Sequence, residues 1–401
     1  MTNSPEMQPL LPSESARGPL AQYASSLIAE GHGLVAQCPA PLRHALSPAL
    51  RAMNSYYTNK IEGQHTLPAD IERALNHDFD ADVALRRKQR LAIAHLEAEA
   101  ELEAAVDRNP FPNLYAPAQI QTIHSALYGR LRSEDRNTEE GHSVEPGQWR
   151  RRRVTAGRHV APKATSIGVL IEAWSRAYRD LQGAELQLIG MACAHHRLAW
   201  IHPFLDGNGR TARLHSYLVL HRLGLTGGLW SPMRGLARRQ DDYYARLANA
   251  DLPRRNDLDG RGHLSQEELV AFARFFLDVC VDQVRFMRDL LQTGKFSERL
   301  ADLLRYLSAN PWPIGSEQSV VKPEVHTALH YVALTGPMER SRFLATSGVP
   351  ERTARRVLAS LLNFGILKSD SRLGPVYFQI PFNSLRWLFP RLWPEAESHG
   401  S

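Results

Sequence analysis

The sequence has little cysteine and no long apolar segment. Its three cysteines, Cys38, Cys193 and Cys280, are scattered and form no Cys-x-x-Cys pair. This argues against a disulfide framework or a zinc site built on thiolates, and it favours a reducing compartment. No stretch approaches the roughly 20 apolar residues that a membrane helix needs. The first residues carry neither a basic segment nor an apolar run, so we expect no signal peptide and predict a cytoplasmic protein.

A marked excess of charge is also missing. The 48 lysines and arginines stand against 42 acidic residues, which gives a formal net charge of +6 over 401 residues. This balance does not by itself predict binding to nucleic acid. Hydrophobic residues make up 43% of the chain, enough to bury a large core and to exclude global disorder. The length fits two or three domains.

Apolar residues recur at helical spacing through most of the chain, which predicts an all-α protein. We expect residues 1–18 to form a flexible tail and residues 19–112 to form an N-terminal helical region. Residues 113–292 are predicted to be a helical core. Residues 293–401 are predicted to contain three helices followed by a hairpin, the pattern of a winged helix-turn-helix domain.

One segment of the predicted core breaks the helical pattern. Residues 154–156 and 159–161 are rich in Val, Thr and Ala and flank Gly157, which predicts a short β-hairpin. Four arginines, residues 150–153, precede it. They could form a basic patch for a target protein or nucleic acid, but a solvated strand edge is the simpler interpretation.

The chemistry is concentrated in the stretch HPFLDGNGRTAR, residues 202–213. His202 follows a predicted helix and precedes a proline, so its imidazole is expected to project from a loop. A histidine there can accept a proton near neutral pH. Asp206, four residues later, provides an anionic oxygen of the kind that Mg²⁺ prefers. The stretch therefore contains a candidate base and a candidate metal ligand.

The rest of the stretch is suited to an anion. Gly207, Asn208 and Gly209 leave backbone N–H groups uncovered just before a helix begins, which predicts an anion cradle. Arg210 and Arg213 are three residues apart, so both lie on one face of the first helical turn and can reach phosphate oxygens. Together with a base and a metal ligand, these groups predict phosphoryl or nucleotidyl transfer.

The stretch matches the pattern H-x-F-x-[D/E]-G-N-G-R-x-x-R at all eight fixed positions, and it resembles the Fic family. The resemblance covers about residues 118–280 and implies a Fic (Fido) helical core. Family members transfer AMP from ATP to hydroxyl side chains of target proteins. The resemblance implies that the hairpin at residues 154–162 is a flap that pairs with the backbone of the target.

The resemblance also implies a role for individual residues. His202 would deprotonate the target hydroxyl and Asp206 would hold Mg²⁺ on the phosphates of ATP. The nucleotide would be bound by eight residues: Gly207, Asn208, Gly209, Arg210, Arg213, Tyr243, Tyr244 and Asn249. The last three lie where the family packs adenine and ribose, and they are assigned by position alone.

A second motif lies upstream, in SYYTNKIEGQHT. Thr58 and Glu62 are four residues apart and share a helix face, and Gly63 is a natural helix stop. The segment resembles the inhibitory motif of the Fic family, [S/T]-x-x-x-E-[G/N]. The resemblance implies that Glu62 pairs with Arg213 and so keeps ATP from binding productively. A helix that ends in an ordinary surface glutamate is the alternative interpretation.

The predicted function is protein adenylylation, autoinhibited by Glu62, with ATP as substrate and Mg²⁺ as cofactor. One alternative is another nucleotidyl- or phosphotransferase on the same core. A second is removal of AMP from a modified target, with Glu62 positioning a water molecule. A third is a DNA-binding regulator that uses the core as a nucleotide sensor.

The sequence says less about binding partners than about the site. We expect an unknown target protein and no membrane. A homodimer is a candidate assembly, because members of the Fic family, which the chain resembles, often self-associate. DNA is a possible partner of the predicted winged helix, because Arg352, Arg355 and Arg356 lie on its expected recognition helix. A docking or dimerisation module is the preferred interpretation of the same sequence.

Overall fold

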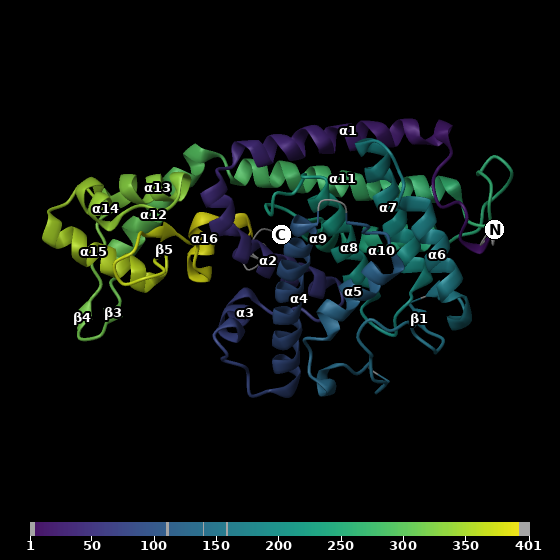
Figure 1. Ribbon diagram of the computed structural model, residues 1–401, viewed down its shortest axis with the longest axis horizontal. Helices are drawn as coiled ribbons and strands as arrows, with labels where there is room; N and C mark the ends of the chain where they lie inside the picture. The colour runs from purple at the N-terminus through teal and green to yellow at the C-terminus, as the bar shows by residue number, and fades with distance from the viewer. Residues whose placement is uncertain (1–4, 110–111, 139, 158, 393–401) are drawn as a thin grey trace. The chain divides into compact units, whose positions relative to one another are not determined.

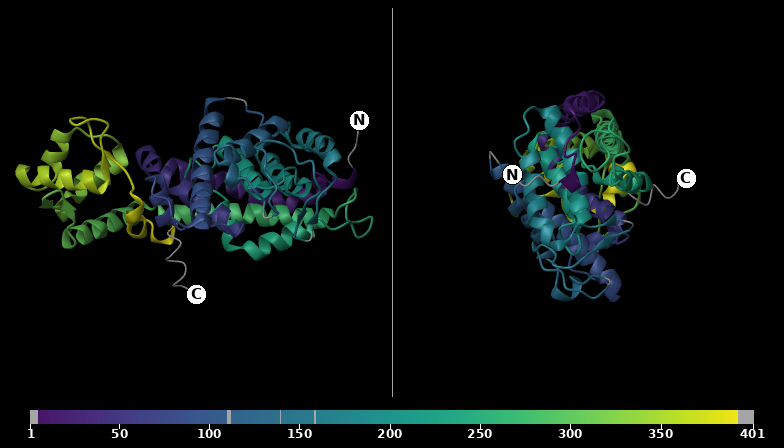
Figure 2. Two further views of the ribbon diagram at one scale, coloured as in Figure 1. Left: turned by 90° about the horizontal axis from the view of Figure 1, so that it is seen from below. Right: turned by 90° about the vertical axis from the view of Figure 1, so that its right-hand side faces the viewer.

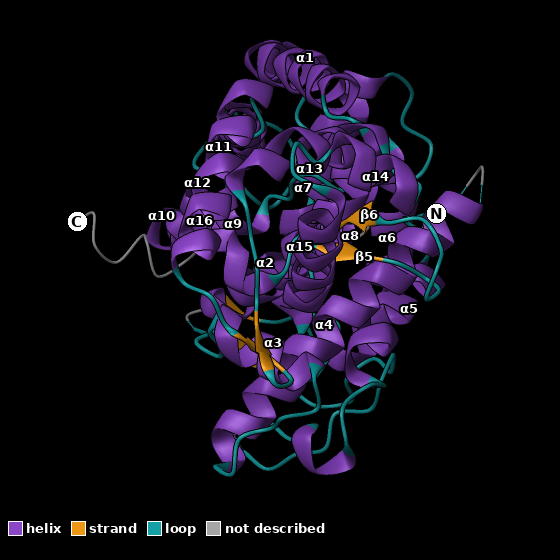
Figure 3. Ribbon diagram, turned by 90° about the vertical axis from the view of Figure 1, so that its left-hand side faces the viewer, coloured by secondary structure: helices purple, strands orange, loops and turns teal. Residues whose placement is uncertain are grey.

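The computed structural model describes residues 5–109, 112–138, 140–157 and 159–392. Helices make up most of the chain, and the only sheets among these residues are three two-stranded hairpins (Figures 1, 2 and 3). The predicted all-α class is confirmed. None of the helices in the described part of the chain is long and apolar enough to cross a membrane. The chain forms two compact units: residues 1–33, 54–66 and 73–285 are unit 1, and residues 34–53, 67–72 and 286–401 are unit 2.

Five helices make the core of unit 1. Helix α7 (Ala184–Ile201) packs against α8 (Asn208–Arg222) and α6 (Ile167–Tyr178), while α5 (Pro117–Tyr128) and α4 (Val83–Arg108) pack on α8. Because α7 and α8 each pack against several helices, most residues of both are buried, several polar ones included. The loop that joins them, residues 202–207, carries the central motif.

The rest of unit 1 surrounds this core. It contains the short helix η2 (Ser133–Asp135), the hairpin β1 (Thr155–Ala156) and β2 (His159–Val160), and the helices η3 (Ala164–Ser166), α9 (Met233–Arg238), α10 (Gln240–Asn249) and α11 (Gln266–Leu290). Strands β1 and β2 are antiparallel, with Thr155 opposite Val160. The hairpin predicted between residues 154 and 161 is therefore confirmed.

The N-terminal segment consists of η1 (Pro5–Met7), α1 (Glu14–Gln37), α2 (Ala40–Ile61) and α3 (Pro68–Leu75). The first half of α1 runs beside α11 (Figure 1), where Tyr23 accepts a hydrogen bond from Arg274 and Glu30 pairs with Arg285. The predicted N-terminal region, residues 19–112, contributes to both units, because α1 and α2 each have residues in both.

The expectation of a flexible tail over residues 1–18 is wrong for residues 5–18. Met7 is fully buried. The Pro9 carbonyl accepts two hydrogen bonds from the buried guanidinium of Arg197, at 3.1 and 3.0 Å, and the Leu10 carbonyl accepts one from Tyr178 at 2.6 Å. Buried donors of the core need acceptors, and the backbone of this segment supplies them.

Unit 2 contains α12 (Thr293–Ala309), the hairpin β3 (Pro313–Ile314) and β4 (Glu317–Gln318), η4 (Pro323–Val325), α13 (His326–Thr335), α14 (Arg340–Thr346), α15 (Glu351–Phe364), the hairpin β5 (Leu367–Lys368) and β6 (Tyr377–Phe378), η5 (Phe382–Ser384), α16 (Leu385–Leu388) and η6 (Pro390–Leu392). Helices α13 to α15 followed by a hairpin give the predicted element order. The winged-helix assignment stays a prediction.

The expected recognition helix, α15, carries paired charges. Arg355 is paired with Glu351, and Arg356 lies 3.7 Å from Glu317, so part of the positive charge of α15 is compensated within unit 2.

Candidate functional site

The loop between α7 and α8 is held in shape by its own residues. Phe204 is fully buried, and its ring stacks on His124 with a centroid distance of 3.8 Å. Asn208 accepts a hydrogen bond from the Phe204 N–H at 2.8 Å and donates one to the Phe204 carbonyl at 2.9 Å. The Asn208 side chain therefore closes the loop and does not face an anion. Only its backbone N–H is suited to the predicted cradle.

His202 ends α7 in the left-handed conformation, with φ 49°. Its Nδ1 lies 3.3 Å from the Ala199 carbonyl, which can only accept, so Nδ1 carries the proton and Nε2 is the free base. Burial lowers the pKa of His202 to about 4, and the charges of His159 and Arg150 act in the same direction. The imidazole is therefore neutral at physiological pH and can take a proton at Nε2.

Asp206 is poised as an ionised ligand. Burial alone would raise its pKa, but the charge of Arg210 and hydrogen bonds from Tyr128 and the Gly207 N–H outweigh burial and lower the pKa. The Gly207 N–H donates to Asp206 Oδ1 at 2.6 Å. Among the described residues no cluster of three metal-ligating side chains occurs. A single carboxylate still fits Mg²⁺, which commonly uses one or two carboxylates together with phosphate oxygens.

Helix α8 begins at Asn208, after Gly207 with φ 77°. The N–H groups of its first turn have no partners within the helix, and they carry the positive end of the helix dipole. The Gly207 N–H is already bonded to Asp206, so the N–H groups of Asn208 and Gly209 are the ones suited to the predicted anion cradle. Gly207 must be glycine for a second reason, because a Cβ there would lie 2.3 Å from the ring of Tyr128.

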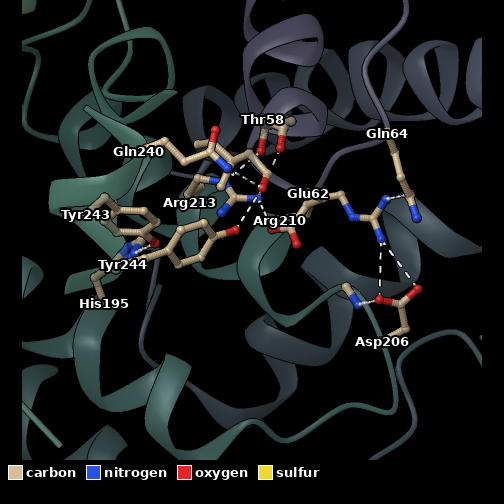
Figure 4. A network of polar contacts seen from close by, with 12 residues as sticks. Thr58, Glu62, Gln64, His195, Asp206, Arg210, Arg213, Gln240, Tyr243 and Tyr244 are labelled. Carbon is tan, nitrogen blue, oxygen red and sulfur yellow. Dashed lines mark hydrogen bonds and ion pairs between the residues drawn. The ribbon is translucent and has the colours of Figure 1, made fainter. Parts of the chain in front are cut away.

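Both arginines of the motif are buried, and both are already engaged (Figure 4). Arg213 donates from Nε to Thr58 Oγ1 at 2.8 Å and from Nη2 to Glu62 Oε1 at 2.5 Å. Arg210 donates from Nη2 to the Tyr128 hydroxyl at 2.8 Å and lies 3.5 Å from the carboxylate of Asp206. The predicted pairing of Glu62 with Arg213 is therefore present in the structure.

The Glu62 carboxylate also covers the cradle. A Cβ built on Gly209 would lie 2.4 Å from Glu62 Oε1, so the carboxylate packs directly on the backbone of the first turn of α8. Helix α2 ends at Ile61, and Glu62 and Gly63, with φ 70°, form the turn that follows it. Thr58 in the last turn of α2 and Glu62 just beyond its end are four residues apart and bind the same guanidinium, which explains why the motif needs both at this spacing.

The three residues expected around adenine differ in their exposure and in their hydrogen bonds. Tyr243 is only 2% exposed, and its hydroxyl lies 2.7 Å from Nε2 of His195, so in this conformation its ring has no free face to stack on a base. Tyr244 is 43% exposed, and its hydroxyl donates to the Ile61 carbonyl at 2.7 Å. Asn249, the last residue of α10, is half-buried.

Two contributors were not predicted from the sequence. Tyr128, at the end of α5, bonds to both Arg210 and Asp206, and its ring stacks on His124 at 4.5 Å. Gln64, two residues beyond Glu62, accepts a hydrogen bond from Arg210 Nη1 at 3.2 Å. No local pattern marks Tyr128, because it comes from another helix. For Gln64 the sequence gives one weak indication, its position two residues after Glu62 of the predicted inhibitory motif.

Comparisons with known proteins agree with this site. Residues 114–220 match the sequence model of the Fic/DOC family. "Protein adenylyltransferase Fic" of Drosophila yakuba is 34% identical over 109 residues, which are 26% of this chain and 21% of that protein. The protein of the same name from Drosophila mojavensis is 30% identical over 133 residues, 32% of this chain and 26% of that protein. The chain thus spans about a quarter or less of the length of these curated relatives.

Solved structures show the same fold. Residues 134–508 of Fic-1 from C. elegans align with a TM-score of 0.51 at 19% identity, over 68% of this chain and 73% of that one. A Fic domain containing signaling protein from Bacteroides thetaiotaomicron aligns with a TM-score of 0.50 at 15% identity, over 66% of this chain and 95% of that one. The motif at residues 202–213 lies inside the segment, residues 114–220, that is similar to the Fic/DOC family.

Proposed function

We propose that this protein is a protein adenylyltransferase that moves AMP from ATP to a Ser, Thr or Tyr hydroxyl of another protein, and that Glu62 holds it inactive. One observation carries the proposal: a neutral histidine with a free Nε2, an ionised aspartate and two buried arginines surround the N-terminus of α8. The names of the curated relatives support the same activity.

The chemistry follows from these positions. Nε2 of His202 accepts the proton of the target hydroxyl as its oxygen bonds to the α-phosphorus. The bond between that phosphorus and the oxygen that bridges to the β-phosphate breaks, and pyrophosphate leaves. The N–H groups of Asn208 and Gly209 stabilise the added negative charge, and the Arg210 and Arg213 guanidiniums hold the outer phosphates. Mg²⁺, when bound, neutralises phosphate charge, and Asp206 is the residue that would hold it.

The basicity of His202 depends on the ligand. In the unliganded protein its pKa is lowered to about 4, chiefly by burial, which makes the imidazole a weak base. A triphosphate bound at the neighbouring helix N-terminus brings negative charge close to the ring and raises its pKa toward the working range. His202 is therefore expected to act as a base only beside bound nucleotide.

Inhibition follows from competition for one cation. Arg213 is 1% exposed, and its guanidinium is shared between Thr58 and Glu62. A γ-phosphate that needs this guanidinium meets a carboxylate of the same charge, which also lies against Gly209. Nucleotide that binds while Glu62 is in place is therefore displaced along the cradle, and its α-phosphorus is not in line with the target hydroxyl.

The proposal is tested with ATP labelled at the α- or the γ-phosphate, Mg²⁺ and a cell lysate. We compare Glu62→Gly with the double variants Glu62→Gly/His202→Ala and Glu62→Gly/His44→Ala; His44 is an exposed histidine of unit 2 and serves as the matched control. We expect α-label, and not γ-label, to reach protein in the first and third samples only. Transfer of γ-label would favour a phosphotransferase.

Three further outcomes distinguish adenylylation from the alternative functions. Absence of any transfer by Glu62→Gly, although calorimetry shows that it binds ATP, would contradict adenylylation. Loss of α-label from a pre-labelled lysate band on adding unlabelled wild-type protein would favour AMP removal. A DNA shift that depends on ATP and survives His202→Ala would favour the regulator.

A further inference from the structure

The four arginines at residues 150–153 differ in exposure and do not form one continuous surface patch. Arg151, Arg152 and Arg153 are exposed, in agreement with a solvated strand edge. Arg150 is only 4% exposed, so for this residue the interpretation is wrong. A buried guanidinium has to be compensated by hydrogen bonds or by an opposite charge, and its partners therefore indicate what it does.

Arg150 bonds to the backbone on both sides of the site. Its Nε–H donates to the carbonyl of His202 at 2.7 Å. Its Nη1 donates to the carbonyl of Arg152 at 2.8 Å, just before β1, and its Nη2 donates to the carbonyl of Pro162 at 2.6 Å, just after β2. The backbone N–H of Arg150 donates to the Pro203 carbonyl at 2.9 Å. One side chain thus joins the candidate base to both ends of the hairpin.

Charge and shape both favour arginine here. Nη2 also lies 3.4 Å from the Ile201 carbonyl, so the guanidinium faces the C-terminal end of α7, the negative end of that helix dipole. Its planar fork directs donors at several carbonyls at once, which a lysine ammonium cannot do in the same geometry. His202 is held with φ 49°, a conformation that is costly for a residue other than glycine, and the bond to its own carbonyl stabilises that conformation.

A separate contact ties the second strand to the same helix end. His159 on β2 donates from Nε2 to the Trp200 carbonyl at 2.8 Å, and its Nδ1 lies 2.9 Å from Asp251. The hairpin is therefore attached to the end of α7 at two points, through Arg150 and through His159. The position of the flap relative to His202 is thus determined by specific contacts.

We propose that Arg150 is a positioning residue that fixes the flap, residues 154–162, relative to His202. The inference rests on the proposed function, in which a target backbone pairs with the flap and presents its hydroxyl to Nε2 of His202. A displacement of about 1 Å between flap and base costs on the order of 100-fold in rate, so a single rigid link between them has a large effect. Arg150 itself touches backbone carbonyls and not the reacting atoms.

The test compares Arg150→Lys and Arg150→Gln with Arg151→Gln, all in the Glu62→Gly protein. Arg151 is exposed and carries the same charge, so it is the matched control. The first readout is amide hydrogen exchange of peptides from residues 154–162 and 199–206 without nucleotide. Both Arg150 variants should exchange at least about 10-fold faster in these segments, and Arg151→Gln should exchange as the parent does.

The second readout is the rate of α-label transfer to the labelled lysate band at several ATP concentrations. Both Arg150 variants should lower kcat about 10- to 100-fold while KM for ATP stays within about twofold, because the phosphate site does not involve Arg150. A general loss of structure would raise KM as well. Normal exchange and normal kcat in Arg150→Lys would overturn the proposal.

A third measurement needs no substitution at residue 150. The Nε–H of Arg150 in the otherwise unmodified protein should exchange at least about 10-fold more slowly than that of Arg151 by nitrogen-15 NMR, because it donates to a buried carbonyl. Equal exchange rates would overturn the inference even if the Arg150 variants do not fold. If Glu62→Gly transfers no label, the proposed function fails, while the two exchange measurements still decide whether Arg150 links the flap to His202.

Discussion

Arg213 and Arg210 are cations inside a helical core, and each needs acceptors whether or not a nucleotide is bound. In the structure Arg213 has Thr58 and Glu62, and Arg210 has Gln64, Tyr128 and Asp206. Leaving either guanidinium without partners would be strongly unfavourable. Under the proposed function, protein groups and phosphate oxygens compete for the same donors, and the free energy of that exchange controls access to the site.

Removing one oxygen atom, the Tyr128 hydroxyl, tests whether this residue positions Arg210 and Asp206. Tyr128→Phe keeps the ring that stacks on His124 but removes the hydroxyl that accepts from Arg210 and donates to Asp206. In the Glu62→Gly background we expect MgATP to bind about 5- to 10-fold more weakly by calorimetry, as the loss of one such bond costs about 1 to 1.5 kcal/mol.

Tyr115 provides the control for this change. Its hydroxyl is buried and has no hydrogen-bond partner among the described residues, so Tyr115→Phe should leave MgATP affinity unchanged. Equal affinities of Tyr128→Phe and its parent would show that the hydroxyl does not position Arg210 and Asp206 for nucleotide.

At the scale of elements, the proposed inhibition depends on the end of α2. The last carbonyls of a helix lack partners within the helix. The Ile61 carbonyl accepts from the Tyr244 hydroxyl at 2.7 Å and from Gln240 Nε2 at 3.2 Å, so two side chains of α10 hold the turn that carries Glu62 (Figure 4). The inhibitory contact therefore depends on α10 as well as on Arg213.

Tyr244→Phe should weaken inhibition in an otherwise unmodified protein. Removing the hydroxyl costs the inhibitory arrangement about 0.5 to 1.5 kcal/mol, so AMP transfer should rise about 2- to 10-fold in the labelling assay. Tyr331 of unit 2 is equally exposed, at 43%, and Tyr331→Phe should change nothing. A rate for Tyr244→Phe at or below that of the unmodified protein would contradict the role of this bond.

The elements that could be predicted from the sequence are those whose signal is local. The hairpin follows from residues 154–161, and the Thr58 to Glu62 spacing places two side chains on one helix face whatever surrounds them. Tyr128 and Arg150 could not be assigned in this way, since their roles depend on where other segments pack. The burial of Arg150 was also not predicted, because three exposed arginines follow it in the sequence. The hydrogen bonds of the Pro9 and Leu10 carbonyls depend likewise on distant donors, Arg197 and Tyr178.

On the scale of the whole molecule, buried neutral histidines make stability depend on pH. Burial lowers the pKa of His95 to about 3 and the pKa values of His124, His202 and His215 to about 4. All four lie in unit 1. In the unfolded chain a histidine titrates near pH 6.5. The unfolded state therefore binds more protons than the folded state between about pH 6.5 and pH 4.

The free energy of unfolding of unit 1 should accordingly fall as pH falls through this window, by up to about 7 kcal/mol between pH 7 and pH 5. His159 acts in the opposite direction, because its contacts with Asp251 and the Trp200 carbonyl raise its pKa despite burial, but it is one group against these four and against His195 and His196, whose pKa values burial also lowers. Urea unfolding at pH 7, 6 and 5, followed by the fluorescence of Trp174 in a variant whose other tryptophans are phenylalanine, measures the change. A midpoint that stays constant or rises toward pH 5 would contradict the prediction.

The most direct test of the central claim, that one carboxylate on Arg213 keeps the transferase inactive, is the initial rate of AMP transfer from α-labelled ATP by the unmodified protein, Glu62→Gln and Glu62→Gly. Glu62→Gln retains the size of the side chain but removes its charge, so it should weaken the 2.5 Å contact with Arg213 without emptying the space over Gly209. We expect Glu62→Gly to be at least about 10-fold faster than the unmodified protein, since an ion pair to the buried Arg213 is worth more than about 1.4 kcal/mol, and Glu62→Gln to lie between them. Equal rates in all three proteins would contradict it.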